Sequence, residues 1–102
     1  MNRQSMIKQA QLLQKKLLEA QENLETLTVE ATAGGGMVKA IVNGKMKLTS
    51  LAIDPEIIDP NEVEILEEIV TAAINEALQK AQDLAQEKMN AITGQMGLPG
   101  TF

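Results

Sequence analysis

The spacing of the apolar residues switches twice along this chain, and that switch most constrains its fold. Residues 3–27 lack glycine and proline and repeat apolar side chains every three or four positions, as amphipathic helices do. Residues 28–53 alternate polar and apolar side chains, as half-buried strands do. Helical spacing returns from about residue 60 to 93. The order predicts an α+β fold with the arrangement α-β-β-β-α.

The apolar stripe of the first predicted helix persists for three heptad-like repeats, so we expect it to pack against another helix or a sheet. Its members are Met6, Ala10, Leu13, Leu17, Ala20, Leu24 and Leu27. Leu12 and Leu18 fall outside the stripe. They are either single exposed leucines or a second contact face that a dimer partner covers.

The middle segment predicts a three-stranded antiparallel meander. The strands are expected at residues 28–33, 37–42 and 45–53. Gly34-Gly35-Gly36 predicts a flexible tip between the first two strands, and Asn43-Gly44 predicts a type I′ turn between the second and third. Alternation fails near Ser50, which indicates a bulge or a change of face.

A second long helix is expected after the meander. Asp54-Pro55 ends the third strand, and the connection that follows has room for a turn of helix. Asp59 is a favourable N-cap and Pro60 suits the first helical position, so we expect the helix to begin at about residue 60. Gly94 is expected to end it.

The length of 102 residues allows one domain, which we place at residues 1–93, with a flexible tail over residues 94–102. The apolar residues are almost all aliphatic, and such a small domain is commonly stabilised by oligomerisation. The stretch 69–78 is apolar over much of its circumference, so we expect it to be covered on two sides. We therefore expect a homodimer. Its interface is predicted to include Leu12, Leu18, Ile41, Ile69 and Ile74.

The composition argues against most enzymes. The chain has no cysteine, histidine, tryptophan or tyrosine, and Phe102 is its single aromatic residue. This excludes disulfides, thiolate and imidazole metal sites, thiol nucleophiles and Ser-His-Asp triads. Platforms that stack on single-stranded bases are missing too. We expect neither an enzyme, nor a cofactor, nor a metal site, nor a small-molecule substrate, and favour binding or assembly.

The apolar runs are too short to suggest a membrane protein. None approaches the roughly 18 residues that span a bilayer. The first residues lack the apolar core of a signal peptide. We expect a cytoplasmic protein without a membrane partner.

Two other clusters favour structural interpretations. Gly34-Gly35-Gly36 precedes a predicted strand and lacks the Lys and Ser/Thr offsets of a phosphate-binding loop. The acidic residues between 54 and 68 lack the spacing and central glycine of an EF-hand. Acidic residues in the first turns of a helix complement its dipole, and they would also keep that end of the molecule away from nucleic acid.

The charge is unevenly distributed. Residues 1–53 carry a net charge of +3 and residues 54–102 a net charge of −8. The first 18 residues contain four basic side chains and no acidic one. Lys8 and Lys15 share the helix face opposite the apolar stripe and lie roughly 10 Å apart, which is about three steps of a DNA strand. An ordinary solvated helix with surface lysines is the alternative.

The order of elements and a series of short motifs resemble the YbaB/EbfC family of bacterial nucleoid-associated proteins over essentially the whole chain. The matching pieces are Met6-Ile7-Lys8-Gln9-Ala10-Gln11, Gly36-Met37-Val38-Lys39, Asn43-Gly44, Ile53-Asp54-Pro55, Val70-Thr71-Ala72-Ala73-Ile74-Asn75-Glu76-Ala77, Glu87-Lys88-Met89 and Met96-Gly97-Leu98-Pro99-Gly100. Each piece is short, but their order and intervals make the match fairly specific.

The resemblance implies a tweezer-shaped homodimer whose helices project from a shared β core. It further implies binding to double-stranded DNA and a role in nucleoid organisation and gene regulation. The family contacts DNA through its terminal helices. By position, the candidate DNA-binding residues are Arg3, Lys8, Lys15, Lys16, Lys80 and Lys88. Lys8 and Lys88 lie inside matching motifs, and the other four are inferred from charge and helix face.

A protein–protein adaptor without significant DNA binding is the alternative function. Its docking surface would be the Leu12/Leu18 face or the acidic helix. The acidic net charge of −5 favours this alternative slightly.

Overall fold

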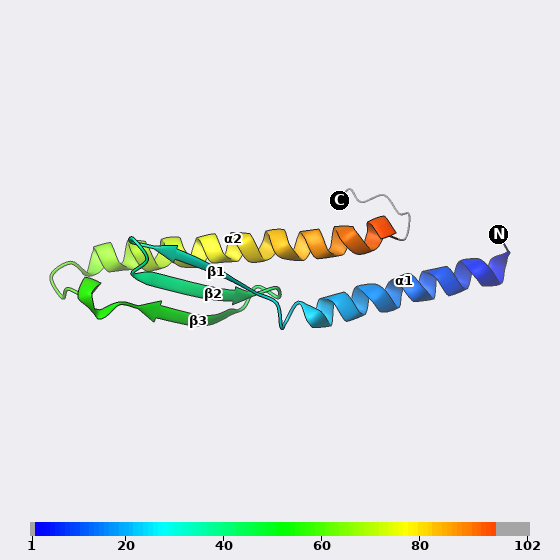
Figure 1. Ribbon diagram of the computed structural model, residues 1–102, viewed down its shortest axis with the longest axis horizontal. Helices are drawn as coiled ribbons and strands as arrows, with labels where there is room; N and C mark the ends of the chain where they lie inside the picture. Colours follow the sequence, from blue (N-terminus) through cyan, green and yellow to red (C-terminus); the bar gives the residue numbers. More distant parts are fainter. Residues whose placement is uncertain (1, 96–102) are drawn as a thin grey trace.

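The structure is a computed structural model that describes residues 2–95. Its elements in chain order are α1 (Arg3–Asn23), β1 (Thr28–Ala33), β2 (Val38–Asn43), β3 (Leu48–Ile53), the 3₁₀ turn η1 (Pro55–Ile57) and α2 (Val63–Gln95) (Figure 1). The predicted α-β-β-β-α arrangement is confirmed, including the short helical turn after β3. Within the described residues, neither long helix combines the length and apolarity needed to cross a bilayer.

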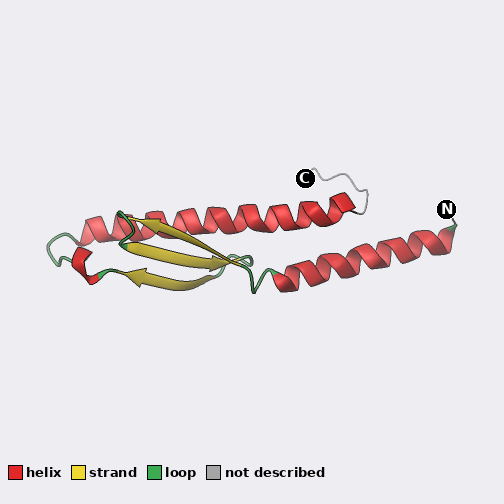
Figure 2. Cartoon of the chain, in the orientation of Figure 1, coloured by secondary structure: helices red, strands yellow, loops and turns green. Residues whose placement is uncertain are grey.

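The three strands form one antiparallel sheet in the order β1-β2-β3. α2 lies along one face of this sheet and packs on β1 and β2 (Figure 2). β3 is an edge strand. Ile53 is its one half-buried residue, and its other five residues are exposed. The helix therefore leaves the third strand uncovered.

The core between α2 and the sheet is built from small side chains. Ala73, Ala77 and Ala81 are fully buried and follow one another at about one helical turn. The buried sheet residues of the same cluster are Ala31, Val38, Ala40 and Val42. Methyl groups let the helix approach the sheet closely, but each removes little apolar surface from water. One chain therefore gains only modest stabilisation from its core.

A bulge interrupts the pairing of β2 with β3, as the sequence predicted. Ile41 pairs with Ser50 and Val42 pairs with Leu48, so Thr49 is the extra residue between them. An extra residue reverses the alternation of faces along a strand. Apolar residues on either side of the bulge can therefore point to the same side of the sheet.

The loop between β2 and β3 differs from the predicted type I′ turn. Gly44 does not have the positive φ that such a turn requires, and Met46 has a φ of 66° instead. The Met46 amide donates to the Asn43 carbonyl at 3.0 Å, and the Asn43 amide donates to the Lys47 carbonyl at 2.9 Å. The loop thus has three residues. The buried Asn43 side-chain oxygen completes it by accepting from the amides of Lys45 and Lys47.

The glycine-rich tip between β1 and β2 is confirmed. Gly34, Gly35 and Gly36 all have positive φ, from 65° to 89°, which side chains other than glycine rarely adopt. Gly34 is also packed: a Cβ there would lie 2.8 Å from Cγ2 of Ile69 in α2. A Cβ on Gly35 would meet nothing within 4 Å.

Gly34→Ala should therefore destabilise the protein more than Gly35→Ala. Both substitutions force a side chain into the left-handed region, at a cost of about 1–3 kcal/mol. Only the first adds a clash with Ile69. Denaturant unfolding monitored by circular dichroism would measure the difference, and equal losses in the two variants would contradict the close approach of the tip to α2.

α1 ends earlier than its sequence pattern predicts. The apolar stripe predicts a helix that continues to residue 27, but the helix ends at Asn23. The Thr26 amide and hydroxyl both bond to the Asn23 carbonyl, which closes a tight turn. The carbonyls of Leu24 and Leu27 instead accept from the Gly44 amide of the β2–β3 loop. This tertiary contact takes the backbone out of the helical path.

The ends of α2 also differ from the prediction. The Asp59 side chain accepts from the Asn61 amide at 2.9 Å, so it closes a turn of its own and does not cap the helix. α2 then begins at Val63, after Pro60. At the other end the helix passes through Gly94 to Gln95. The rest of the predicted tail, residues 96–102, lies outside the described part.

Candidate nucleic-acid interface

Two helical arms leave the sheet in the same direction. α1 and the C-terminal half of α2 run in opposite chain directions, and the N-terminal end of α1 reaches furthest from the sheet (Figure 1). The molecule is elongated, with extents of 71 × 21 × 16 Å. No residue of α1 is buried. Its residues 3–12 are all exposed, so this outer part presents its whole circumference to solvent or to a binding partner.

The apolar stripe of α1, which was expected to pack against another helix or a sheet, is covered by its own chain only from the middle of the helix to its base. Met6 is 59% exposed, whereas Leu13, Leu17 and Ala20 are half-buried. Leu24, just past the helix, is buried. The outer part of α1 extends past the end of α2 at Gln95, so α2 does not lie beside the exposed part of the stripe (Figure 1).

A hollow of about 460 Å³ lies between the arms near their base. Its wall is formed by Ala20, Asn23, Thr26, Leu27, Lys88, Ala91 and Ile92. Lys88 thus stands at the inner side of α2, where it faces the base of α1. Of the candidate cations on α2, it is the one that the structure brings close to the first arm.

Lys80 makes a different contact. Its ammonium donates to the Glu30 backbone carbonyl of β1 at 3.1 Å. The Glu30 carboxylate in turn pairs with Lys39 at 3.0 Å. Lys80 therefore lies against the sheet and links α2 to β1. Sequence reasoning could not anticipate this, because the bonded residues are 50 positions apart.

The four basic residues of α1 form no ion pair with any residue that the structure describes. Among residues 2–95 the ion pairs are Lys39 with Glu30 and Lys45 with Glu25. Arg3, Lys8 and Lys15 are exposed. An unpaired, solvated cation on a projecting helix is free to approach a phosphate without first breaking an internal bond.

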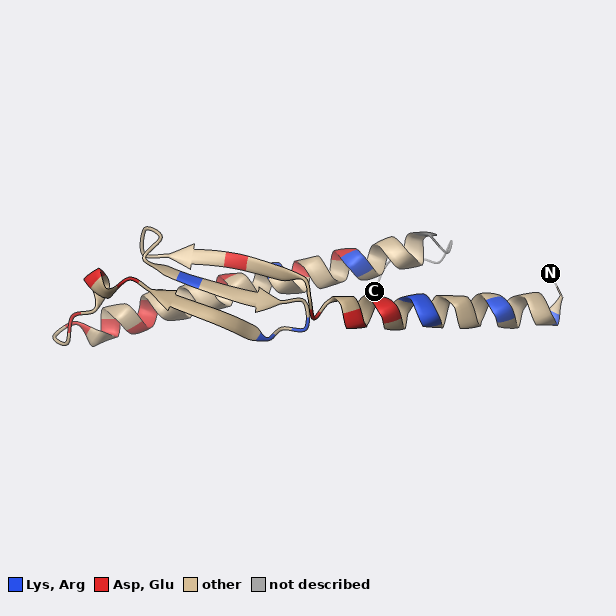
Figure 3. Ribbon diagram, turned by 60° about the horizontal axis from the view of Figure 1, so that its bottom comes forward, with Lys and Arg blue, Asp and Glu red and all other residues tan. Residues whose placement is uncertain are grey.

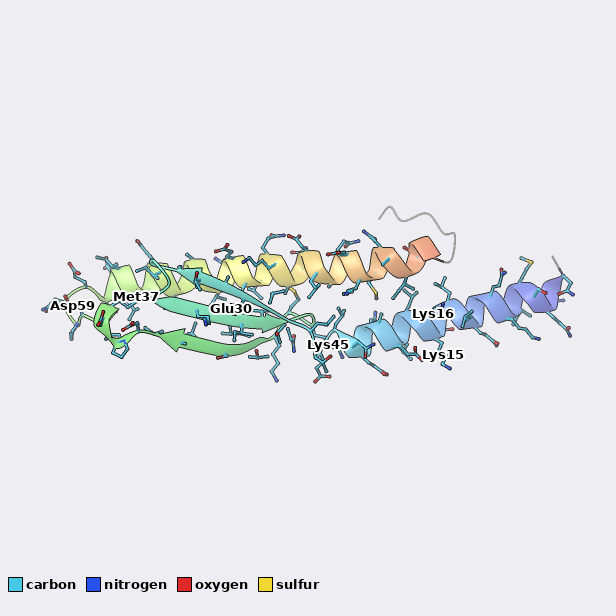
Figure 4. All side chains as sticks on the ribbon, in the orientation of Figure 1. Lys15, Lys16, Glu30, Met37, Lys45 and Asp59 are labelled. Atoms are coloured by element: carbon cyan, nitrogen blue, oxygen red, sulfur yellow. The ribbon has the colours of Figure 1, made fainter. Side chains whose placement is uncertain are left out.

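The cations of α1 do not all share one face. Lys16 is half-buried because it flanks the covered stripe, while Lys15 is exposed. Figure 4 shows the two on different sides of the helix. Lys8 and Lys15 occupy the face opposite the stripe, seven residues apart. The basic side chains of α1 thus lie on more than one face of the helix and do not form a single row.

The acidic residues gather at the opposite end of the molecule. Figure 3 shows a dense acidic cluster around η1 and the first turns of α2, whereas the charged residues on the outer turns of α1 are all basic; further acidic residues lie at the base of α1 and along the second half of α2. The members of this acidic end are Asp54, Glu56, Asp59, Glu62, Glu64, Glu67 and Glu68. The uneven charge of the sequence therefore becomes a separation along the long axis. A polyanion is attracted to the outer part of α1 and repelled from the acidic end.

The residues predicted for dimerisation have different environments. Leu12 and Leu18 are 47% and 57% exposed. Ile41 is half-buried on β2, between the buried Ala40 and Val42 and thus on the sheet face away from α2. Ile69 and Ile74 pack against the core of their own chain. Only the first three are thus largely left for a partner to cover.

Sequence reasoning missed two apolar residues of β3. Leu48 pairs with Val42 and Leu51 pairs with Ala40, so both leucines lie on the core side of the sheet. α2 does not reach them, and they are 38% and 39% exposed. Both leucines belong to the apolar pattern of the strand. Because the bulge shifts the alternation between them, the sequence pattern did not indicate that Leu48 and Leu51 lie on the same face.

Comparison with known proteins agrees with this architecture. Residues 1–96 match the model of the YbaB/EbfC DNA-binding family. Nucleoid-associated proteins of Pelotomaculum thermopropionicum and Thermoanaerobacter pseudethanolicus are 46% and 48% identical over 101 residues, covering 99% of this chain and 96% and 91% of theirs. A crystal structure of an uncharacterized Helicobacter pylori protein shares the fold, with a TM-score of 0.72 at 20% identity over 85% of this chain and 91% of that one. Neither curated relative is named for an enzymatic activity. The chain belongs to the YbaB/EbfC DNA-binding family.

Proposed function

We propose that this protein binds double-stranded DNA as a homodimer, with low sequence specificity, and acts in nucleoid organisation and gene regulation. The observation that carries the proposal is the projecting α1 arm. Its four basic residues are unpaired among the described residues, and the acidic end lies at the other extreme of the molecule. This arrangement presents positive charge to a duplex and turns negative charge away.

The incomplete core supports the homodimer. Leu48 and Leu51 extend the buried face of the sheet beyond α2, and they remain exposed in the single chain. A second copy that covers them would bury apolar surface at about 25 cal/mol per Å². It would also double the number of basic arms available to one DNA molecule.

The residue types on α1 support low sequence specificity. Lysine reaches phosphates as a point charge, and α1 has a single arginine and no aromatic side chain. Without a side chain that intercalates or stacks, binding rests on charge and on the shape of the duplex. Arg3 and the glutamines of α1 are the side chains best suited to read base edges, because the Asn2 side-chain oxygen already accepts from the Ser5 amide and caps the helix.

The curated relatives are named as nucleoid-associated proteins, and we propose the same location for this chain, the nucleoid within the cytoplasm. Its partners are then double-stranded DNA and a second copy of itself. No small-molecule substrate or membrane enters this function.

A salt titration of binding to random-sequence duplex DNA tests the proposal. Affinity should fall steeply with salt, because each phosphate contact contributes about −0.9 to the slope of log K against log salt. Eight cations from two α1 arms limit that slope to roughly −7. Fluorescence anisotropy between low and physiological salt would measure it.

A slope near zero would contradict the proposal, as would affinity no better than millimolar at physiological salt. That outcome would favour the protein–protein adaptor. The exposure of Leu12 and Leu18 on α1 is the observation that supports this second function.

A further inference from the structure

The base of α1 is held by a close backbone contact. The Gly44 amide, in the loop between β2 and β3, donates to the carbonyls of Leu24 and Leu27 at 2.8 and 2.9 Å. Gly44 is buried at this point. A Cβ placed on it would lie 2.7 Å from the Leu24 carbonyl oxygen and 2.9 Å from both Cβ and Cδ2 of Leu24. Only glycine fits without displacing the end of the arm.

The contact between Gly44 and Leu24, which we call the joint, is flanked by buried and hydrogen-bonded residues. Leu24 is 7% exposed, although α1 itself has no buried residue. Asn43, which is 3% exposed, holds the loop by accepting from the amides of Lys45 and Lys47. The other contact of α1 is with α2 around the hollow at the base of the arms. The direction of α1 is therefore set by contacts along its second half and just past its end, from Leu13 to Leu24, and its outer half has no part in them.

A small rotation at the joint becomes a large displacement at the tip. The 21 residues of α1 make a lever of roughly 30 Å. A tilt of about 10° at the base moves the tip by roughly 5 Å, which exceeds the axial rise of about 3.4 Å per phosphate of one DNA strand. Arg3 and Lys8 would lose their alignment with a duplex before Lys15 or Lys16 did.

We infer that Gly44 is a positioning residue for DNA binding. Because it has no side chain, the base of α1 can lie against it, and this contact fixes the angle of the α1 arm. The angle in turn sets the distance between the cations of the two α1 arms in the proposed dimer. The inference rests on the proposed function, because it assigns Gly44 a role in presenting the same basic surface. Gly44 does not itself touch DNA. It acts through Leu24 and the helix that Leu24 anchors.

Gly44→Ala is the direct test. Gly44 does not have a positive φ, so the backbone accepts alanine and the substitution adds only the clash with Leu24. Leu24→Ala is the second variant, since it loosens the same joint without adding bulk. Gly94→Ala is the matched control, because a Cβ there meets nothing within 4 Å.

The arm angle is measured without DNA. The chain has no cysteine, so Gln11→Cys in α1 and Gln82→Cys in α2 give two spin-label sites at exposed positions. Labelled chain is diluted into excess unlabelled chain, so that distances within one chain dominate the pulsed electron resonance signal. Gly44→Ala should shift the distance distribution, Leu24→Ala should broaden it, and Gly94→Ala should leave it unchanged.

DNA binding is then measured in the same variants with random-sequence duplex. In Gly44→Ala we expect the Kd to rise about tenfold at fixed salt. The slope of log K against log salt should become shallower by about 1–2 units as one or two phosphate contacts are lost. A variant that is merely less stable has fewer active molecules but an unchanged slope, so the slope separates positioning from instability.

Unchanged arm distances in both joint variants would overturn the inference, as would altered distances with unchanged affinity and slope. Loss of the folded core in both variants would overturn it too, because the joint would then serve folding and not orientation. If the wild-type protein fails to bind duplex DNA, the proposed function fails, while the distance measurement still decides whether Gly44 sets the arm.

Discussion

Replacing Lys8, Lys15 and Lys16 together by glutamate is expected to abolish duplex binding without unfolding the protein. Each chain changes by six charge units, and a dimer by twelve. The three side chains form no ion pair within the described residues, and none is buried, so the fold loses little. The remaining cation of α1, Arg3, then stands beside three carboxylates that repel phosphates. An electrophoretic mobility shift with random duplex DNA measures the loss.

Three further variants make this result specific. The triple substitution to arginine keeps the charge and should retain binding. The Lys8/Lys15 pair shares the outer face of α1, whereas Lys16 flanks the covered stripe. Reversing the pair should therefore weaken binding more than reversing Lys16 alone. Unchanged affinity in the glutamate triple variant, with circular dichroism showing an intact fold, would contradict the assignment of α1 as the DNA-binding arm.

Replacing Leu48 and Leu51 by aspartate is expected to dissociate the proposed homodimer. Both leucines lie on the core side of the sheet beyond the reach of α2. Covering two carboxylates in an apolar interface costs several kcal/mol per ion, which is a large share of what such an interface contributes. Sedimentation equilibrium at micromolar concentration should give the chain mass of 11.0 kDa for the variant and twice that value for the wild type.

Ala52→Asp provides the control for this experiment. Ala52 is also exposed on β3, but it pairs with Lys39, which lies on the other face of the sheet. The control should remain a dimer if the core side forms the interface. Dissociating the dimer should also roughly halve the salt slope of DNA binding, because one arm is left instead of two. A wild-type protein that sediments at 11.0 kDa would refute the homodimer.

The elements themselves were accessible from local patterns. The alternation between residues 28 and 53 located three strands within a few residues of their ends, and the glycine run was correctly interpreted as a turn. The bulge near Ser50 was also visible as a break in the alternation. These features depend on neighbours within a few positions, and side-chain spacing reports them directly.

The element ends were less accessible, because competing bonds decide them. Asp59 has the residue type of a helix cap, yet its carboxylate bonds two residues ahead and closes a separate turn. Gly94 has the residue type of a helix stop, yet α2 continues past it. Met46 adopts the positive φ that the sequence predicts at Asn43-Gly44. In each case the sequence offers a signal that another local hydrogen bond or a longer helix outweighs.

The candidate DNA-binding site also has features that the sequence predicts and features that only the structure shows. The sequence alone determined the order of helices and strands, the excess of positive charge in the first 18 residues and the absence of residues for most catalytic chemistry. Only the tertiary structure decided that α1 projects with its cations outside the ion pairs of residues 2–95, that Lys80 lies against the sheet, and that Gly44 anchors the arm. The physical reason is separation along the sequence: periodicity and local charge depend on residues that are close together in the chain. The angle of an arm depends on a backbone contact between residues 24 and 44, which leaves no trace in either segment by itself.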